Sequence, residues 1–144
     1  MPSTWRSGSA GVPKVVRIPQ PRLPGGLFGP GQLAPLRPLA KQADVLHLHG
    51  LWTASNAQVA RLARREGLPY ILSLHGMLDD FSLSVKPLKK KLFLMTSGGV
   101  LLRGAGEVHC ASTEELAQAR PRLPAGAPAR GVAIPLLFDT AAYE

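Results

Sequence analysis

Two histidines that are each followed directly by glycine are the residues of this chain best suited to chemistry. His49 and Gly50 end the apolar stretch "DVLHLHG", and His75 and Gly76 end a second one, "YILSLHG". A histidine ring offers both a hydrogen-bond donor and an acceptor, and glycine lets the backbone approach a ligand closely or take a positive φ angle. The two steps therefore predict polar groups at a binding cleft. The alternative is that these histidines are polar strand ends held by backbone groups.

Other titratable residues near these steps give weaker signals. Asp79 and Asp80 follow His75 closely and could act on a substrate hydroxyl, but adjacent aspartates are also ordinary turn formers. His47 shares a strand face with His49, so with His75 three histidines could in principle bind zinc. No carboxylate motif supports such a site, and we expect no metal.

Cys110 is the only cysteine, which excludes an intrachain disulfide and a multi-cysteine metal site. Neighbours on a strand point to opposite faces, so we expect Cys110 to pack in the core rather than to pair with His109 as a nucleophile. A single cysteine is typical of a reducing, cytosolic compartment. The apolar stretches are far shorter than the roughly 20 residues that a membrane-spanning helix needs.

A cluster of lysines follows the second histidine step and has two interpretations. Its members are Lys86, Lys89, Lys90 and Lys91. They form either the solvated face of a helix whose other face carries Leu88, Leu92 and Met95, or a basic helix face that, with the adjacent Phe93 and Leu94, contacts anionic lipid or the phosphate of an acceptor.

The elements that would position these residues alternate between strand and helix. Apolar runs predict strands at 45–49, 70–75, 107–112 and 131–135, and helical periodicity predicts helices at 55–67, 84–102 and 112–120. Capping-box spacings, Ser55 with Gln58 and Ser112 with Glu115, open two of the helices, and Gly98 with Gly99 predicts a break in the third. Strands that are apolar at most positions predict an α/β fold with a Rossmann-like parallel sheet, flanked by helices and buried on both faces. Ligands bind such sheets at the carboxyl ends of the strands, where both His-Gly steps fall.

The first 43 residues differ from the rest in composition. They contain eight of the 14 prolines. They also contain six basic residues and no acidic one, so this segment carries a charge of +6. The rest of the chain has 11 basic and 9 acidic residues and adds only +2 to the net charge of +8. We expect a poorly structured basic arm at 1–43, with a strand at 14–19 and a weak helix at 32–42, and a domain at 44–144. The charge lies mostly in the arm, which weakens the usual inference of a polyanionic partner.

The order of five motifs resembles the N-terminal domain of the family 4 glycosyltransferases, also called glycosyltransferase group 1. The motifs are "ADVLHLHGLWTASN", "RREGLPYILSLHGMLDD", the lysine-rich helix, "EVHCASTEELAQAR" and "GVAIPLLFD". The resemblance implies a GT-B enzyme whose N-terminal domain receives the acceptor and whose other domain holds a sugar nucleotide. Such enzymes transfer the sugar with retention and need no cofactor. It further implies that His75 reaches toward the transferred sugar, with Gly76 after it as in the family, and that His49 and Gly50 line the acceptor site. Gly76 and, from its position close to His75, Asp79 are further candidates for substrate binding.

The sequence departs from this family pattern in three places. We find no opening strand, glycine-rich loop and long helix before Asp44; "IPLLFD" replaces the family's "IPNGVD"; and the chain ends where a donor domain would begin. We therefore expect the acceptor-side half of a truncated or split enzyme of surface glycan synthesis, such as exopolysaccharide synthesis. It would work with a donor-domain chain, a sugar nucleotide and a glycan or lipid-linked acceptor, in the cytoplasm or on the inner face of the membrane, without nucleic acid.

Two other interpretations of the sequence stay open. The chain could be a non-catalytic basic module that binds membrane or nucleic acid through the arm and the lysine cluster. It could also be an inactive remnant, because a missing first βαβ unit would expose a sheet edge.

Overall fold

A parallel sheet of four strands organises the chain, as the sequence predicted. The computed structural model describes residues 15–124 and 130–135. Strands β1 (Leu46–His49), β2 (Tyr70–Ser73), β3 (Glu107–Cys110) and β4 (Arg130–Ala133) lie side by side in chain order. Leu48 lies opposite Leu72, and Leu72 lies opposite Val108. The α/β, Rossmann-like interpretation is confirmed.

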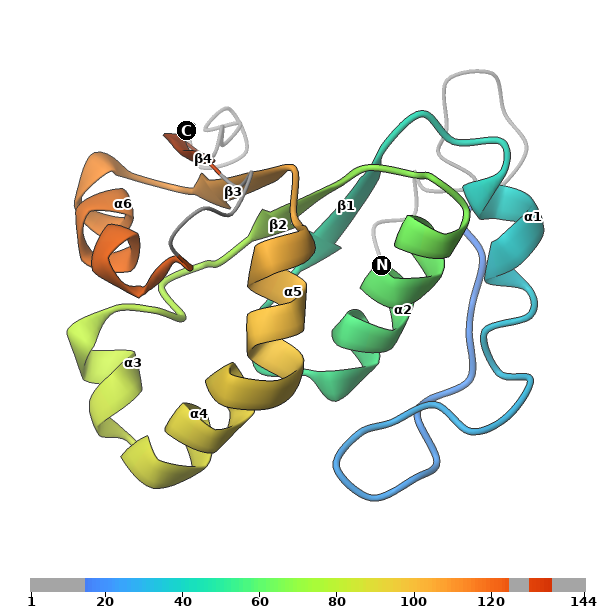
Figure 1. Ribbon diagram of the computed structural model, residues 1–144, viewed down its shortest axis with the longest axis horizontal. Coiled ribbons are helices and arrows are strands. Elements are labelled where there is room, and N and C mark those ends of the chain that lie inside the picture. Colours follow the sequence, from blue (N-terminus) through green and yellow to red (C-terminus); the bar gives the residue numbers. More distant parts are fainter. Residues whose placement is uncertain (1–14, 125–129, 136–144) are drawn as a thin grey trace, which may run out of the picture.

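Helices connect the strands and cover one face of the sheet. They are α1 (Leu36–Ala40), α2 (Ala54–Arg65), α3 (Asp80–Ser84), α4 (Pro87–Phe93), the π-helical η1 (Leu94–Gly98), α5 (Gly99–Gly104), α6 (Thr113–Ala119) and the 3₁₀ turn η2 (Arg120–Arg122). Figure 1 shows α2, α5 and α6 on the same side of the sheet. The core forms between this face and the helices, where Leu72, Val108 and Leu101 are fully buried. Tyr70 is 1% exposed there, and its hydroxyl donates to the carbonyl of Leu101 at 2.6 Å.

The expectation that both sheet faces are buried is wrong for the part of the chain that the structure describes. On the second face, alternate strand residues line an open hollow of about 430 Å³. These residues are His47, Ile71, Glu107, His109 and Val132, with Ile134 and Pro135 at its end. No described helix covers them (Figure 1). The apolar character of the strands therefore reflects one packed face and one face that is only partly shielded.

The first predicted capping box does not form. Helix α2 begins at Ala54 after Thr53, and no side chain caps it. The Gln58 amide instead accepts from the N–H of Phe28 at 2.7 Å and donates to the carbonyl of Phe28 at 3.1 Å. A contact across 30 residues thus holds the segment around Phe28 against α2.

The expected break at Gly98 and Gly99 takes the form of a π-helical turn. The backbone stays helical from α4 through η1 to α5, and Figure 1 shows α5 running in a different direction from α4. A Cβ atom on Gly99 would lie 2.4 Å from the carbonyl oxygen of Leu94, and one on Gly98 would lie 2.8 Å from the ring of Phe93. Gly99 is required because the wider turn brings the carbonyl of Leu94 this close, whereas the nearest group at Gly98 is a side chain.

Three further features differ from the expectations. The strand predicted at 14–19 is absent from residues 15–19, and residue 14 lies outside the described part of the chain; the weak helix at 32–42 shortens to α1. The stripe Leu88, Leu92 and Met95 is exposed, which does not fit the first interpretation of the lysine cluster, in which only the lysine face is solvated. Helical spacing identifies a stripe but does not say which side faces the protein.

Candidate functional site

The structure brings the two histidines of the His-Gly steps into direct contact. Because β1 pairs with β2 in parallel and His49 lies opposite Ser73, the loops that follow these strands are neighbours. His49 Nδ1 lies 2.9 Å from His75 Nε2, and the rings stack with centroids 5.2 Å apart and planes at 13°. Both side chains are exposed, so the pair forms an open polar edge.

His75 lies in the turn after β2, not at the last strand position. Its φ angle is +53°, in the left-handed region. A residue with a Cβ atom pays about 1–2 kcal/mol for that conformation. Strain of this kind persists only where the surrounding structure holds it, and such residues cluster at functional sites.

The turn around His49 is held from two sides. Gly50 has a φ of +86°, and the side-chain amide of Asn56, in the first turn of α2, donates to the carbonyls of both His49 and Gly50 at 2.8 Å. Met77 reaches across from the second loop, where its sulfur accepts from the N–H of Leu51 at 3.0 Å. These contacts fix the first histidine step against the second.

Glu115 on α6 holds the second step and was missed as a site residue by sequence reasoning. Its Oε1 accepts from the N–H of Gly76 at 2.5 Å, and its Oε2 accepts from the N–H of Ala111 at 2.6 Å. The expected capping box forms only in part, because Ser112 Oγ accepts from the N–H of Glu115 at 3.1 Å but the carboxylate does not return to Ser112. The carboxylate instead joins the loops that follow β2 and β3. No sequence signal identifies this role, since it depends on two loops that are neighbours only in the folded sheet.

A chain of side-chain hydrogen bonds runs across the open sheet face toward the pair. His109 Nε2 donates to the carbonyl of Ile134 at 2.8 Å, so in the neutral ring Nδ1 accepts from the Ser73 hydroxyl at 2.7 Å. The Ser73 oxygen in turn accepts from His47 Nε2 at 2.7 Å, and the His47 ring lies 4.3 Å from that of His49. Partial burial lowers the pKa of His47, and the neighbouring His49, His109 and His75 lower it further. Ser73, fully buried, is the junction of this chain and was also missed.

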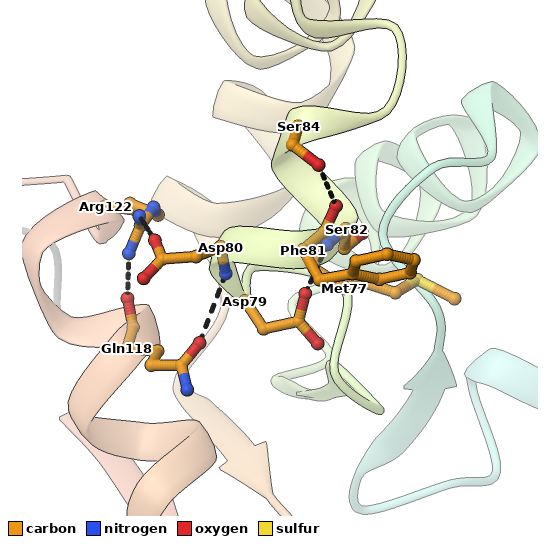
Figure 2. Close-up of polar contacts among 8 residues, drawn as sticks. All are labelled: Met77, Asp79, Asp80, Phe81, Ser82, Ser84, Gln118 and Arg122. Atoms are coloured by element: carbon orange, nitrogen blue, oxygen red, sulfur yellow. Dashed lines mark hydrogen bonds and ion pairs between the residues drawn. The ribbon is translucent and has the colours of Figure 1, made fainter.

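The two aspartates after the second step have structural partners. Asp79 caps α3, with Oδ1 accepting from the N–H of Ser82 at 2.5 Å, and Asp80 forms an ion pair with Arg122 (Figure 2). The N–H of Asp80 also donates to Gln118 Oε1 at 3.1 Å. Both residues therefore act as the turn formers that the sequence allowed. The role of Asp79 in substrate binding stays a prediction.

The remaining candidates divide between surface and core. Cys110 is fully buried, as predicted; burial and then the charge of Glu115 raise the pKa of its thiol to about 11.

Within residues 15–124 and 130–135, no group of three or more potential ligands is arranged to hold a metal ion. Lys86, Lys89 and Lys91 are exposed, whereas Lys90 donates to the carbonyl of Ser82. None of the described helices is both long and apolar enough to cross a bilayer.

The comparison with protein families agrees with the motif order. Residues 2–136 match the model of the glycosyl transferase 4-like domain, a span that includes the sheet and both His-Gly steps. No curated protein and no solved structure gives a significant match. Since the family model matches nearly the whole sequence, the chain belongs to the glycosyl transferase 4-like domain family.

Proposed function

We propose that this chain is the acceptor-side part of a retaining GT-B glycosyltransferase. It would transfer a hexose from a sugar nucleotide to a glycan or lipid-linked acceptor in the synthesis of a surface polysaccharide. Family membership supports glycosyl transfer and the binding of a sugar nucleotide and an acceptor in general. The contact between His49 and His75 at the ends of β1 and β2 is the observation that supports a sugar-binding site at this edge of the sheet.

The histidine pair is suited to a sugar hydroxyl for a reason that does not depend on its tautomer. One proton lies between His49 Nδ1 and His75 Nε2 when both rings are neutral. Whichever ring carries it, one of the two outer ring nitrogens is then a donor and the other an acceptor. Neither outer nitrogen has a partner among the described residues, so the pair offers one donor and one acceptor to a ligand.

The residues around the pair receive matching roles. His75 would contact the transferred sugar, while His49 and Asp79 would bind acceptor hydroxyls; Asp79 has Oδ2 free of hydrogen bonds to the described residues. Gly50 and Gly76 let both turns form without side chains. Both have positive φ angles, and a Cβ atom would come close to the side chain of Met77 at position 50 and to that of Asp79 at position 76. The N–H of Gly76 is taken by Glu115, so this glycine would contribute close approach and not a donor.

The proposal divides the reaction between two partners. A departing nucleoside diphosphate needs fixed positive groups or dipoles. We place these on a separate donor-domain chain and assign contact with the membrane or with the acceptor phosphate to Lys86, Lys89 and Lys91. Lys90 was expected to share this contact, but its ammonium group already binds Ser82 and lies 5.0 Å from the centre of the Trp52 ring. Sugar nucleotides are cytoplasmic metabolites, so the proposal places the chain in the cytoplasm.

A transfer assay tests the proposal. The full chain is incubated with a panel of sugar nucleotides and glycan acceptors, alone and with a donor-domain chain encoded beside it. Release of nucleoside diphosphate reports turnover, and NMR of the product reports the anomer. We expect transfer with retention only when both chains are present. Robust transfer by this chain alone would refute the need for a partner.

Variants connect the activity to the histidine pair. His75→Ala is expected to lower kcat/KM about tenfold, the size of one lost hydrogen bond to the transferred sugar. Thr113→Ala is the control, because Thr113 is exposed on α6 and lies outside the pair and its hydrogen-bond chain. Equal activity of His75→Ala and the wild type would show that the site lies elsewhere.

A further inference from the structure

Five large apolar side chains are exposed on α3, α4 and the segments that adjoin them. Their exposed fractions are 81% for Phe81, 47% for Val85, 80% for Leu88, 62% for Leu92 and 70% for Met95. Single apolar residues on a surface are normal, but a group of them on neighbouring elements marks an interaction site, and α3 and α4 are in contact. We name these five residues the apolar patch.

The patch is exposed because the opposite side of the same helices is anchored to the protein. Lys90 donates to the carbonyl and hydroxyl of Ser82 and lies over the ring of Trp52. Phe93 meets the Trp52 ring edge-on with centroids 5.7 Å apart, and Leu94 packs against the core. Trp52 and the core therefore hold α4 with Leu88 and Leu92 turned outward.

Helix α3 is anchored independently, to α6 and η2. Asp80 pairs with Arg122, its N–H donates to Gln118, and Arg122 also donates to the carbonyl of Gln118. Figure 2 shows the ring of Phe81 pointing away from these contacts. The exposure of Phe81 is thus fixed by the clamp on its neighbour Asp80.

Positive charge borders the patch. At 3.6 residues per turn, Leu88, Leu92 and Met95 fall on one stripe, Lys89 and Lys91 lie on its two sides, and Lys90 lies opposite. The sequence from Phe81 to Gly106 contains no acidic residue. A hollow of about 490 Å³ opens beside Met95 and is lined by Leu83, Pro87, Lys90, Lys91, Leu94 and Arg122. The surface is therefore apolar at its centre and cationic at its rim and in the adjoining hollow.

We infer that the apolar patch docks on the surface of an anionic phospholipid bilayer. Phe81, Leu88 and Leu92 enter the boundary between headgroups and acyl chains, and Lys86, Lys89 and Lys91 contact lipid phosphates. A second copy of this chain fits less well, because a symmetric contact through this patch would bring lysines of the same sign together. The inference goes beyond the transfer reaction. Since α3 begins shortly after His75, docking would also hold the histidine pair near the headgroups.

Sedimentation with vesicles tests this inference on the full chain. Phosphatidylcholine vesicles are compared with vesicles of phosphatidylcholine and phosphatidylglycerol at low and high salt. We expect binding to the anionic vesicles that weakens as salt rises. Lys89→Gln with Lys91→Gln should lower the partition coefficient about 30-fold, at roughly fivefold for each charge near the surface. Leu88→Ser with Leu92→Ser should lower it at least about tenfold.

Matched variants separate the patch from general surface properties. Leu23→Ser with Val45→Ser removes exposed apolar groups elsewhere, and Arg61→Gln with Arg65→Gln removes two exposed cations from α2. Both control pairs should bind nearly as the wild type does, and thermal melting checks that every variant folds. Loss of binding equal to that of the patch variants would overturn the inference.

Two other results would also overturn it. One is no binding to anionic vesicles at low ionic strength. The other is a dimer in analytical ultracentrifugation that Leu88→Ser with Leu92→Ser abolishes, without any vesicle binding, which would assign the patch to a second copy. Vesicle binding needs no sugar nucleotide, so its failure leaves the transfer assay unaffected.

Discussion

His49 Nδ1 and His75 Nε2 lie 2.9 Å apart although 26 residues separate them in the sequence. Parallel pairing of β1 with β2 produces this contact, because it places the carboxyl ends of both strands at the same edge. The crossover helix α2 accounts for the sequence separation. Two adjacent parallel strands that each end in a His-Gly step therefore bring two imidazole rings together.

The left-handed conformation of His75 predicts a conflict between stability and function. His75→Gly removes a backbone cost of about 1 kcal/mol and loses one exposed hydrogen bond worth about the same, so its unfolding free energy should stay within about 1 kcal/mol of the wild type. His75→Ala keeps the positive φ angle and loses the bond, so it should be less stable than His75→Gly by about 1 kcal/mol. Urea unfolding measures both. An alanine variant as stable as the glycine variant would show that the turn is not strained.

The lowered pKa of His47 predicts a loss of stability in mild acid. Burial is the main cause, and neighbouring His49, His109 and His75 add to it. Because the folded protein binds this proton less readily than the unfolded chain does, stability is complete above about pH 6.5, the ordinary histidine value, and falls as the pH drops below it. His47→Gln keeps a donor for Ser73 without the titration. Its melting temperature should therefore depend less on pH between 7 and 5, and an unchanged pH profile would contradict the assignment.

The arrangement of the site was predictable to the extent that it follows from the sheet. Alternation of apolar residues predicted β1 and β2, and the rule that ligands bind at carboxyl strand ends placed His49 and His75 together. The turn conformation of His75 was not predictable, because it depends on the loop contacts of Met77 and Glu115 rather than on the local sequence.

The lysine helix shows a different limit of sequence reasoning. The spacing of Leu88, Leu92 and Met95 correctly identified one apolar stripe. Which side of a helix faces the protein depends on what lies beneath it, here Trp52 and the carbonyl of Ser82. Both partners come from other elements, so periodicity alone left both interpretations of the lysine helix open.

Glu115 accepts hydrogen bonds from two backbone N–H groups, so we expect its carboxylate to stabilise the folded protein. Glu115→Ala leaves the N–H groups of Gly76 and Ala111 without an acceptor and should cost about 2 kcal/mol in unfolding free energy. Glu115→Gln keeps one carbonyl oxygen and should cost about half as much. Thr113→Ala, an exposed change in the same helix, should have little effect. If chemical denaturation gave equal stability for Glu115→Ala and Thr113→Ala, the bridge between the two loops would not be a stabilising contact.

The π-helical turn predicts a strict requirement for glycine at position 99. The Cβ atom of Gly99→Ala would lie 2.4 Å from the carbonyl oxygen of Leu94, and a backbone atom cannot move aside as the end of a flexible side chain can. The turn would have to rearrange, at a cost of about 2–3 kcal/mol in unfolding free energy. Gly106→Ala is the matched control, because its nearest contact, the carbonyl of Tyr70, lies at 3.7 Å and its φ angle is not positive. Thermal melting should show a marked decrease for the first variant and little change for the second. Equal melting temperatures would mean that α4 and α5 join through an ordinary α-helical turn, which has room for a side chain at this position.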